Sequence, residues 1–361
     1  MIIRILLMVI AGLHAAIHLL GFVKAFGLAR VEQLSKPISK PAGVLWLVAA
    51  GLFFYGLLLF LLKNKLWWAC GLAGIVLSQS LIMLYWQDAK YGTIANAILL
   101  LACIVGYGQW DFIRTVESEV NTLIKSAGQS HALAEGVSAE ALPAPVKRWM
   151  QFSRAEKVRS SRTAHLYQAG RMKLSPEGDW KQVQAEQWFT LQRPGFLWSA
   201  QVGSGSLLQF SGRDRYTSGK GSMLINLYSL VPVVNASGMQ IDQGVAVRYL
   251  AEMVWFPQAA MSPYLRWEQT GPLQAKATLA YMSTEVKGEF TFNSIGQAVR
   301  FEALRYYDKT GSMEKWVIDI DEDSYRAFDR VRVPTRARVT WQLAGGGFTW
   351  YELEINGVEY Q

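Results

Sequence analysis

The side chains of this sequence that could do chemistry are few. The chain has 361 residues with four histidines and two cysteines. His14 and His18 lie four residues apart, which places them on one face of a helix. Imidazoles in this arrangement can hold a metal ion or a haem iron. Two histidines on one side of one helix cannot ligate both faces of a haem, so we favour a hydrogen-bonded polar pair and keep a membrane redox site as an open alternative.

A second candidate is the segment GRDRYTSGKG at residues 212–221, which is rich in glycine and in cations. Glycine-rich turns can expose backbone N–H groups to anions, and Arg and Lys side chains bind phosphate. The segment lacks the spacing of a nucleotide-binding loop. We predict a turn between two strands, with Arg213 and Lys220 as candidate contacts for a phospholipid headgroup.

A third candidate is the pair Arg248 and Glu252, four residues apart in a segment that we predict to be helical, residues 244–261. Such a pair stabilises a helix by only ~0.2–0.5 kcal/mol, so a structural role is one interpretation. The other places the pair at the lip of a cleft. The ligand-binding residues predicted on that basis are Trp198, Arg213, Lys220, Arg248, Glu252, Trp255, Phe256 and Trp267.

Recognised catalytic and metal-binding motifs are missing from the sequence. It contains no GxSxG, HExxH or CxxC, and the acidic run at residues 319–330 departs from a calcium-binding loop. His165 is the single histidine after residue 140. The Lys and Arg residues after residue 140 form no basic stripe. We expect no catalytic residues, no metal, no cofactor and no nucleic acid, and a protein that is not an enzyme.

The first elements that the sequence predicts are membrane-spanning helices. Half of the chain is apolar (51%) and only 18% is charged, and residues 1–139 hold just 10 of the 36 Lys and Arg residues. A helix needs ~20 mostly apolar residues to cross a bilayer. Four windows without formal charge meet this length, the first only just: residues 5–23, 41–62, 66–87 and 91–110. Both cysteines, Cys70 and Cys103, fall inside these windows.

The orientation of the spans is left open by the sequence. Lys and Arg residues in the connecting segments are equally numerous on the two faces, five on each, so the positive-inside rule does not decide. An even number of spans places the N-terminus and the C-terminal region on the same side.

The rest of the chain is predicted to form a junction and then a β domain. Residues 111–126 place Phe112, Val116, Val120, Leu123 and Ile124 on one helical face. Residues 127–145 resemble a linker and contain His131. From residue 146, aromatic and β-branched stretches alternate with Gly, Pro, Asn and Asp turns, which is typical of antiparallel hairpins. We predict an α+β membrane protein: a four-helix domain at 1–110, a junction at 111–139, and an antiparallel β half-barrel with one inserted helix at 140–361.

Several stretches resemble known families. LPAPVKRWM (142–150), PGFLWSAQV (194–202), GVAVRYLAEMVWFP (244–257), the Arg305-Tyr306 pair and VPTRARVTW (333–341) resemble an uncharacterised bacterial family, a domain of unknown function. The predicted half-barrel also resembles the lipoprotein carriers LolA and LolB. HLLGFVKAF (18–26) and KPISKPAGVLWL (36–47) resemble the four-helix DoxX-like membrane proteins. None of these resemblances implies an established activity for the chain.

Nine of the fourteen tryptophans follow residue 140, more aromatic surface than a core of this size usually needs. One interpretation is a sheet with large packing residues, and the other is a concave face that holds an apolar ligand. We predict a membrane-anchored, non-enzymatic binding or carrier domain for an apolar or lipid-like ligand. The alternative is a subunit or assembly factor of a membrane protein complex, with the β domain docking a membrane protein partner. We expect a bacterial inner-membrane location with the β domain outside the cytoplasm.

Overall fold

The structure is a computed structural model that describes residues 2–128, 138–204 and 208–361. The chain divides into two compact units, Met1–Arg114 with Tyr228–Leu230, and Thr115–Leu227 with Val231–Gln361. The predicted linker falls largely on residues 129–137, which lie outside the described residues, and so does His131.

The first unit is helical. Its helices are α1 (Ile2–Ala25), α2 (Lys40–Leu61), α3 (Trp67–Leu84), the short α4 (Trp86–Ala89) and the first part of α5 (Gly92–Gly128). Within the described residues, α1, α2, α3 and α5 are long and apolar enough to cross a membrane. These four helices match the four predicted windows.

Helix α5 differs from the expectation. The fourth window and the junction helix at 111–126 were predicted as separate elements, but residues 92–128 form one helix of 37 residues. The reason is local: the polar stretch that follows Trp110 contains no Gly or Pro that would break the hydrogen-bond ladder before Gly128. In the second part of α5, Val116, Val120 and Leu123 are buried, as their spacing predicts.

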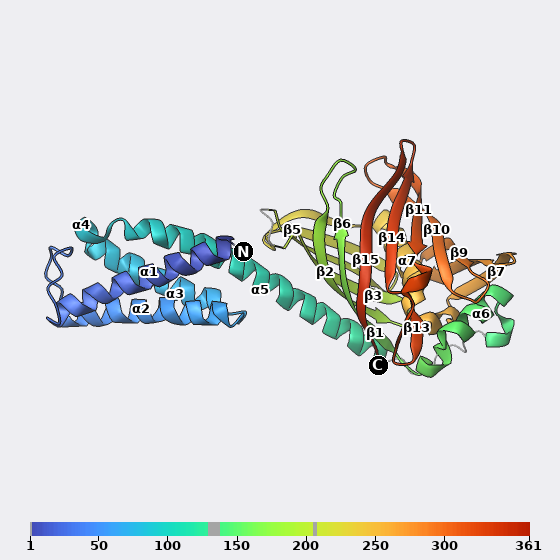
Figure 1. Cartoon of the computed structure of the whole chain (residues 1–361), viewed down its shortest axis with the longest axis horizontal. Helices are drawn as coiled ribbons and strands as arrows, with labels where there is room; N and C mark the ends of the chain where they lie inside the picture. The colour runs from blue at the N-terminus through green and yellow to red at the C-terminus, as the bar shows by residue number, and fades with distance from the viewer. Residues whose placement is uncertain (1, 129–137, 205–207) are drawn as a thin grey trace. The chain divides into compact units, whose positions relative to one another are not determined.

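The second unit is built on an antiparallel sheet (Figure 1). Its strands run in the order β6-β5-β4-β3-β2-β1-β15-β14-β11-β10-β9-β8-β7 and form a curled half-barrel, while β12 and β13 pair separately. The strand bounds are β1 (Thr163–Met172), β2 (Lys181–Thr190), β3 (Gly195–Val202), β4 (Phe210–Thr217), β5 (Lys220–Leu227), β6 (Val231–Ser237), β7 (Leu265–Gly271), β8 (Gln274–Tyr281), β9 (Thr284–Phe292), β10 (Ala298–Tyr307), β11 (Ser312–Ile320), β12 (Arg326–Phe328), β13 (Val331–Val333), β14 (Arg336–Leu343) and β15 (Gly346–Tyr360).

The segment at 212–221 forms the β4–β5 hairpin. Its two-residue turn has Ser218 and Gly219 at positive φ (52° and 76°), the left-handed conformation that tight hairpin turns require. Only this tight turn separates β4 from β5. Arg213 and Lys220 therefore lie on the strands rather than in an open loop.

Helices complete this unit. They are α6 (Ala144–Ser153) and α7 (Met239–Glu252), with 3₁₀ turns at Ala139–Ala141, Ala155–Val158, Met253–Trp255, Pro257–Met261 and Glu322–Ser324. The helix predicted at 244–261 thus begins earlier and ends at Glu252, and the 3₁₀ turns that follow flank Pro257 as the proline rule predicts.

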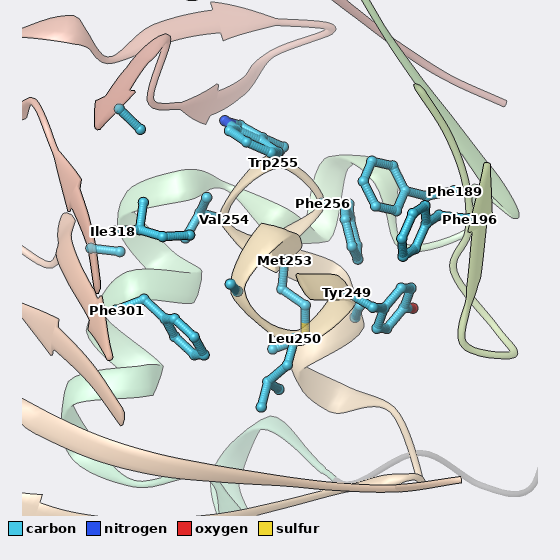
Figure 2. Packing of buried hydrophobic residues seen from close by; sticks show 14 of the residues in the cluster. Phe189, Phe196, Tyr249, Leu250, Met253, Val254, Trp255, Phe256, Phe301 and Ile318 are labelled. Atoms are coloured by element: carbon cyan, nitrogen blue, oxygen red, sulfur yellow. The ribbon is translucent and has the colours of Figure 1, made fainter. Parts of the chain in front are cut away.

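Helix α7 lies on the concave side of the half-barrel and covers part of it. It contacts β4, β5 and β6 near one end of the strand order and β8, β9 and β10 near the other. Residues on every side of it are buried, as expected for a helix surrounded by protein. Figure 2 shows Tyr249 and Phe256 against Phe189 and Phe196, with Phe301 on another side. The expectation that the inner surface is uncovered by the chain's own residues is therefore wrong for the part of the sheet that α7 contacts.

Candidate functional site

The predicted pair Arg248 and Glu252 lies at the centre of a buried polar network between α7 and the inner face of the sheet. The Arg248 Nε atom donates to Glu252 Oε1 at 2.7 Å, and Nη1 donates to Asp214 Oδ2 on β4, also at 2.7 Å. The guanidinium lies 4.7 Å from the Trp198 ring centroid. Two carboxylates thus neutralise one arginine away from water, which is the condition under which a buried charge is tolerated.

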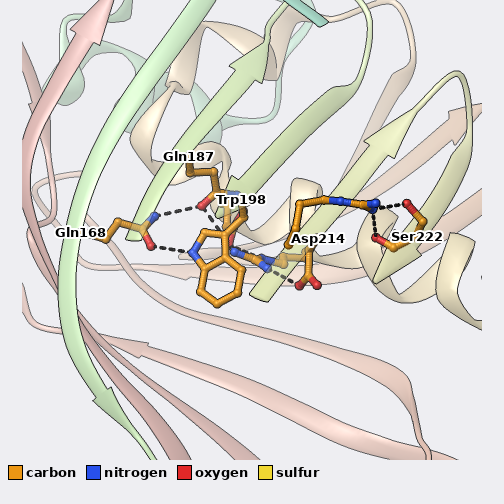
Figure 3. Close-up of polar contacts among 8 residues, drawn as sticks. Gln168, Gln187, Trp198, Asp214 and Ser222 are labelled. Carbon is orange, nitrogen blue, oxygen red and sulfur yellow. Dashed lines mark hydrogen bonds and ion pairs between the residues drawn. The ribbon is translucent and has the colours of Figure 1, made fainter. Parts of the chain in front are cut away.

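Glutamine side chains extend this network to Trp198 (Figure 3). The Gln187 Nε2 atom donates to Glu252 Oε2 at 2.6 Å, and Gln168 donates to Gln187 Oε1 at 2.9 Å. The Trp198 indole N–H donates to Gln168 Oε1 at 3.1 Å. The structure therefore brings Trp198, Arg248 and Glu252 together, but their partners come from the chain itself.

The other predicted site residues lie apart from this network. Arg213 Nε lies 3.0 Å from Glu119 Oε2 on α5, and Lys220 Nζ lies 2.9 Å from Asp242 Oδ2 on α7. These ion pairs fasten α5 and α7 to β4 and β5. Both cations are occupied by carboxylates of the chain, so we do not carry them forward as headgroup contacts.

The three remaining aromatic residues pack inside the protein. Trp255 and Phe256 are buried, with exposed fractions of 3% and 0%, and the Trp255 indole N–H donates to the Pro334 carbonyl oxygen. The Trp267 indole N–H donates to the Ala260 carbonyl oxygen. Since these side chains are engaged with the core, we do not carry forward the prediction that they face a ligand.

A cleft opens where two strands of the sheet separate. Strand β10 pairs with β9 only up to Glu302, which lies opposite Glu289. Beyond that point β10 continues along β11 and β9 along β8, so residues 284–288 and 303–307 are not paired with each other. The Phe301 ring lies over Gly288, where a Cβ atom would come within 2.2 Å of it. The Phe301 ring can therefore occupy this position, where β9 and β10 separate, only because residue 288 is a glycine.

This opening has a volume of about 430 Å³ and is lined by α7, β8, β9, β10 and β11. Small-molecule pockets typically measure about 300–1,000 Å³. Val247 and Val286 supply apolar walls, and Leu304 and Met313 are 61% and 51% exposed at the outer side. We name this opening the β9–β10 cleft. It is a hollow beside α7 that the chain's own side chains leave unfilled.

Arg305 is the one charged group on the inner side of the β9–β10 cleft among the described residues. The alternation along β10 places it on the same face as Phe301 and Ala303, toward α7. Its guanidinium lies 4.9 Å from the Trp316 ring centroid, and the backbone of Gly244 leaves room for it beside α7. No described carboxylate or carbonyl oxygen forms an ion pair or a hydrogen bond with it.

The environment of Arg305 disfavours its charge. Its pKa is lowered to about 10, first because burial penalises the charged form and second because of the positive charge of Arg248. Asp214 and Glu252 act in the opposite direction, but both are hydrogen-bonded to Arg248. Arg305 is partly exposed to solvent. Arg305, which has no ion-pair partner among the described residues, therefore lines the β9–β10 cleft.

The histidines of the first unit form a separate network. His18 Nδ1 donates to the His14 carbonyl oxygen at 2.7 Å, which leaves His18 Nε2 to accept from the Ser78 hydroxyl at 2.9 Å. His14 Nε2 lies 2.8 Å from Asn96 Oδ1, and Asn96 Nδ2 donates to Ser78 at 3.0 Å. The predicted polar pair accounts for these contacts. Within the described ranges, no group of three or more His, Cys, Asp and Glu residues could hold a metal ion.

The fold and these sites define an α+β protein with four candidate spans and a curled antiparallel sheet around a helix. The chain belongs to the family of unknown function DUF6920, which matches residues 140–360 and thereby confirms the resemblance to an uncharacterised family. No curated protein matches the chain.

Among the solved structures that are similar to the chain, two cover about 60% of it at low identity. One is a DUF1329 family protein from Desulfovibrio piger ATCC 29098, with 11% identity and a TM-score of 0.36 over 61% of this chain and 94% of that one. The other is a putative outer membrane lipoprotein-sorting protein domain from Vibrio parahaemolyticus, with 10% identity and a TM-score of 0.29 over 60% and 93%. Similarities this low do not indicate which ligand the chain binds. The DoxX-like resemblance stays a prediction.

Proposed function

We propose that this protein is a membrane-anchored, non-enzymatic binding or carrier protein that holds an apolar or lipid-like ligand in the β9–β10 cleft. The observation that carries the proposal is the cleft itself, about 430 Å³ of space with Val247 and Val286 as apolar walls and charged side chains at its rim. This cleft replaces the predicted site on the concave face, because α7 covers part of that face and the side chains predicted there are bonded to other residues of the chain.

The physical basis is burial of apolar surface. Each Å² of apolar area removed from water contributes ~25 cal/mol, so a ligand that buries about 200 Å² in the cleft gains about 5 kcal/mol before the cost of association. Leu304 and Met313 are exposed without such a ligand and would be covered by it. No catalytic group is needed for this kind of binding.

The membrane location enters the proposal through α1, α2, α3 and α5, which are long and apolar enough to span. We place them in the bacterial inner membrane with the β domain outside the cytoplasm. A lipid-like molecule that leaves a membrane surface needs shelter from water, and a binding domain tethered at that surface provides it.

The experiment is to purify the full chain in a mild detergent, extract it with organic solvent, and identify bound lipids by mass spectrometry. A Gly244→Leu variant places a side chain in the β9–β10 cleft, because a Cβ atom there makes only ordinary contacts with Arg305, the nearest at 3.4 Å. Gln240→Leu introduces the same residue on the same helix at an exposed position.

We expect a lipid-like molecule in constant proportion to the native protein and to Gln240→Leu, and its loss from Gly244→Leu. Equal recovery from all three chains, or no such molecule in any of them, would refute the proposed function.

A further inference from the structure

The ligand of the β9–β10 cleft can be described more closely from the charges around it. The outer rim carries charges of both signs: Lys276 and Lys287 lie there together with three glutamates. Glu285 is paired with Arg266, and Glu302 is paired with Lys315. The rim therefore selects neither sign of charge.

The inner side of the cleft is different, because Arg305 has no described anionic partner. A guanidinium that is partly enclosed by protein loses part of its hydration, and an anion or other hydrogen-bond acceptor offsets that cost. At Arg248 the chain itself supplies the anions, because Asp214 and Glu252 both form ion pairs with the guanidinium. Arg305 has aromatic rings instead, at 4.9 and 5.8 Å from its Cζ atom. Its N–H donors therefore remain available at the cleft.

The apolar walls and the cation together define one kind of ligand. Val247, Val286, Leu304 and Met313 lie along the cleft, and Arg305 lies at its inner side. We propose that the cleft binds an amphiphile with a single anionic headgroup, a carboxylate or a phosphate, which pairs with Arg305 while the hydrocarbon chain follows the apolar walls toward the outer rim. This inference rests on the proposed function and specifies its ligand class.

Arginine suits this role better than lysine would. Its planar fork presents paired N–H donors that match the two oxygens of a carboxylate or phosphate. The Arg305 guanidinium is also restricted in position, because the Gly244 backbone and the Trp316 ring lie on two sides of it. A ligand headgroup thus meets a cation that is already in place, which reduces the entropy lost on binding.

The test uses the full chain in a non-ionic detergent and measures quenching of its tryptophan fluorescence by brominated amphiphiles. The probes are 12-bromododecanoate and 12-bromododecanol, which share a chain and differ in the headgroup. Dodecyl phosphate and inorganic phosphate serve as competitors, so that a lipid headgroup is distinguished from a free anion. The variants are Arg305→Met, Arg305→Lys and the control Arg266→Met, which removes an exposed cation beside the rim.

We expect the native chain and Arg266→Met to bind bromododecanoate about tenfold or more tightly than Arg305→Met does, since a hydrogen bond to a charged group contributes about that factor. Arg305→Lys should bind with intermediate affinity. Bromododecanol should bind all four chains equally, and dodecyl phosphate should compete while inorganic phosphate should not.

Unchanged bromododecanoate affinity in Arg305→Met would overturn this inference, and so would equal affinity of the native chain for the two probes. In either case binding of the neutral probe would leave the proposed function standing. Displacement by inorganic phosphate would show a free-anion site and also overturn it. Binding of neither probe would refute the function and the inference together.

Discussion

Two arginines of the second unit lie close enough for their charges to interact, and they differ in their partners. Arg248 has two carboxylates within hydrogen-bond distance, whereas Arg305 has aromatic rings and a hollow. The first arrangement is complete without a ligand. The second gives the guanidinium no described protein acceptor, and an anion bound in the cleft would supply one.

This difference predicts opposite effects of the same substitution. Arg248→Met should lower the stability of the unit by about 3–5 kcal/mol, because it leaves Asp214 and Glu252 buried without a cation. Arg305→Met should leave the melting temperature of the ligand-free protein unchanged or raise it, because it removes a partly buried charge that has no described ion-pair partner. Thermal unfolding of both variants, followed by tryptophan fluorescence, checks this. A loss of stability in Arg305→Met as large as in Arg248→Met would show that Arg305 is a structural residue.

Much at the residue scale could not be predicted from the sequence. The spacing of Arg248 and Glu252 gave their mutual contact, but Asp214 is 34 positions away from Arg248 and nothing local connects them. In the sequence, Arg305 stands out only as part of a pair that resembles a family of unknown function. Period-two alternation with Phe301 and Ala303 is the signal that could have placed it on the inner face, while its lack of a partner is visible only in three dimensions.

At the scale of elements, the β9–β10 fork depends on Gly288. A Cβ atom there would lie 2.2 Å from the Phe301 ring, and that ring is fully buried. Gly288→Ala should therefore force a shift of the ring or the strand and cost about 1–3 kcal/mol. Gly345→Ala, at a glycine with no atom near its Cβ position, is the matched control. Equal melting temperatures for the two variants would contradict the account of the fork.

The elements themselves were largely predictable, with exceptions that have physical causes. Uncharged windows predict the spans, and the alternation that predicts antiparallel strands is visible in β9 and β14. Strand β6 was missed because Pro232 and an exposed surface on both sides are typical of an edge strand with little periodic signal. The place of α7 was missed because a helix buried on all sides has no apolar face to indicate what it packs against.

At the scale of the whole molecule, the side of the membrane on which the β domain lies is the main open proposal. Glu177→Cys and Glu32→Cys introduce thiols at exposed positions, one in the β1–β2 connection and one between α1 and α2. With four spans these positions lie on opposite sides. In intact spheroplasts, we expect a membrane-impermeant maleimide to label Glu177→Cys and to label Glu32→Cys only after lysis.

The native Cys103 is buried and Cys70 lies within α3, so the unmodified chain provides the background for this labelling. The reverse pattern would place the β domain in the cytoplasm. The β9–β10 cleft would then face ligands of that compartment, and the proposed location would be wrong.

The most direct test of the central claim is hydrogen–deuterium exchange of the full chain with and without dodecanoate. The account predicts slower exchange at residues 243–247, 284–288 and 303–307, which surround the cleft, and the loss of this effect in Gly244→Leu. Protection confined to other segments of the β domain, or none at all at saturating dodecanoate, would contradict the claim that this protein holds its ligand beside α7.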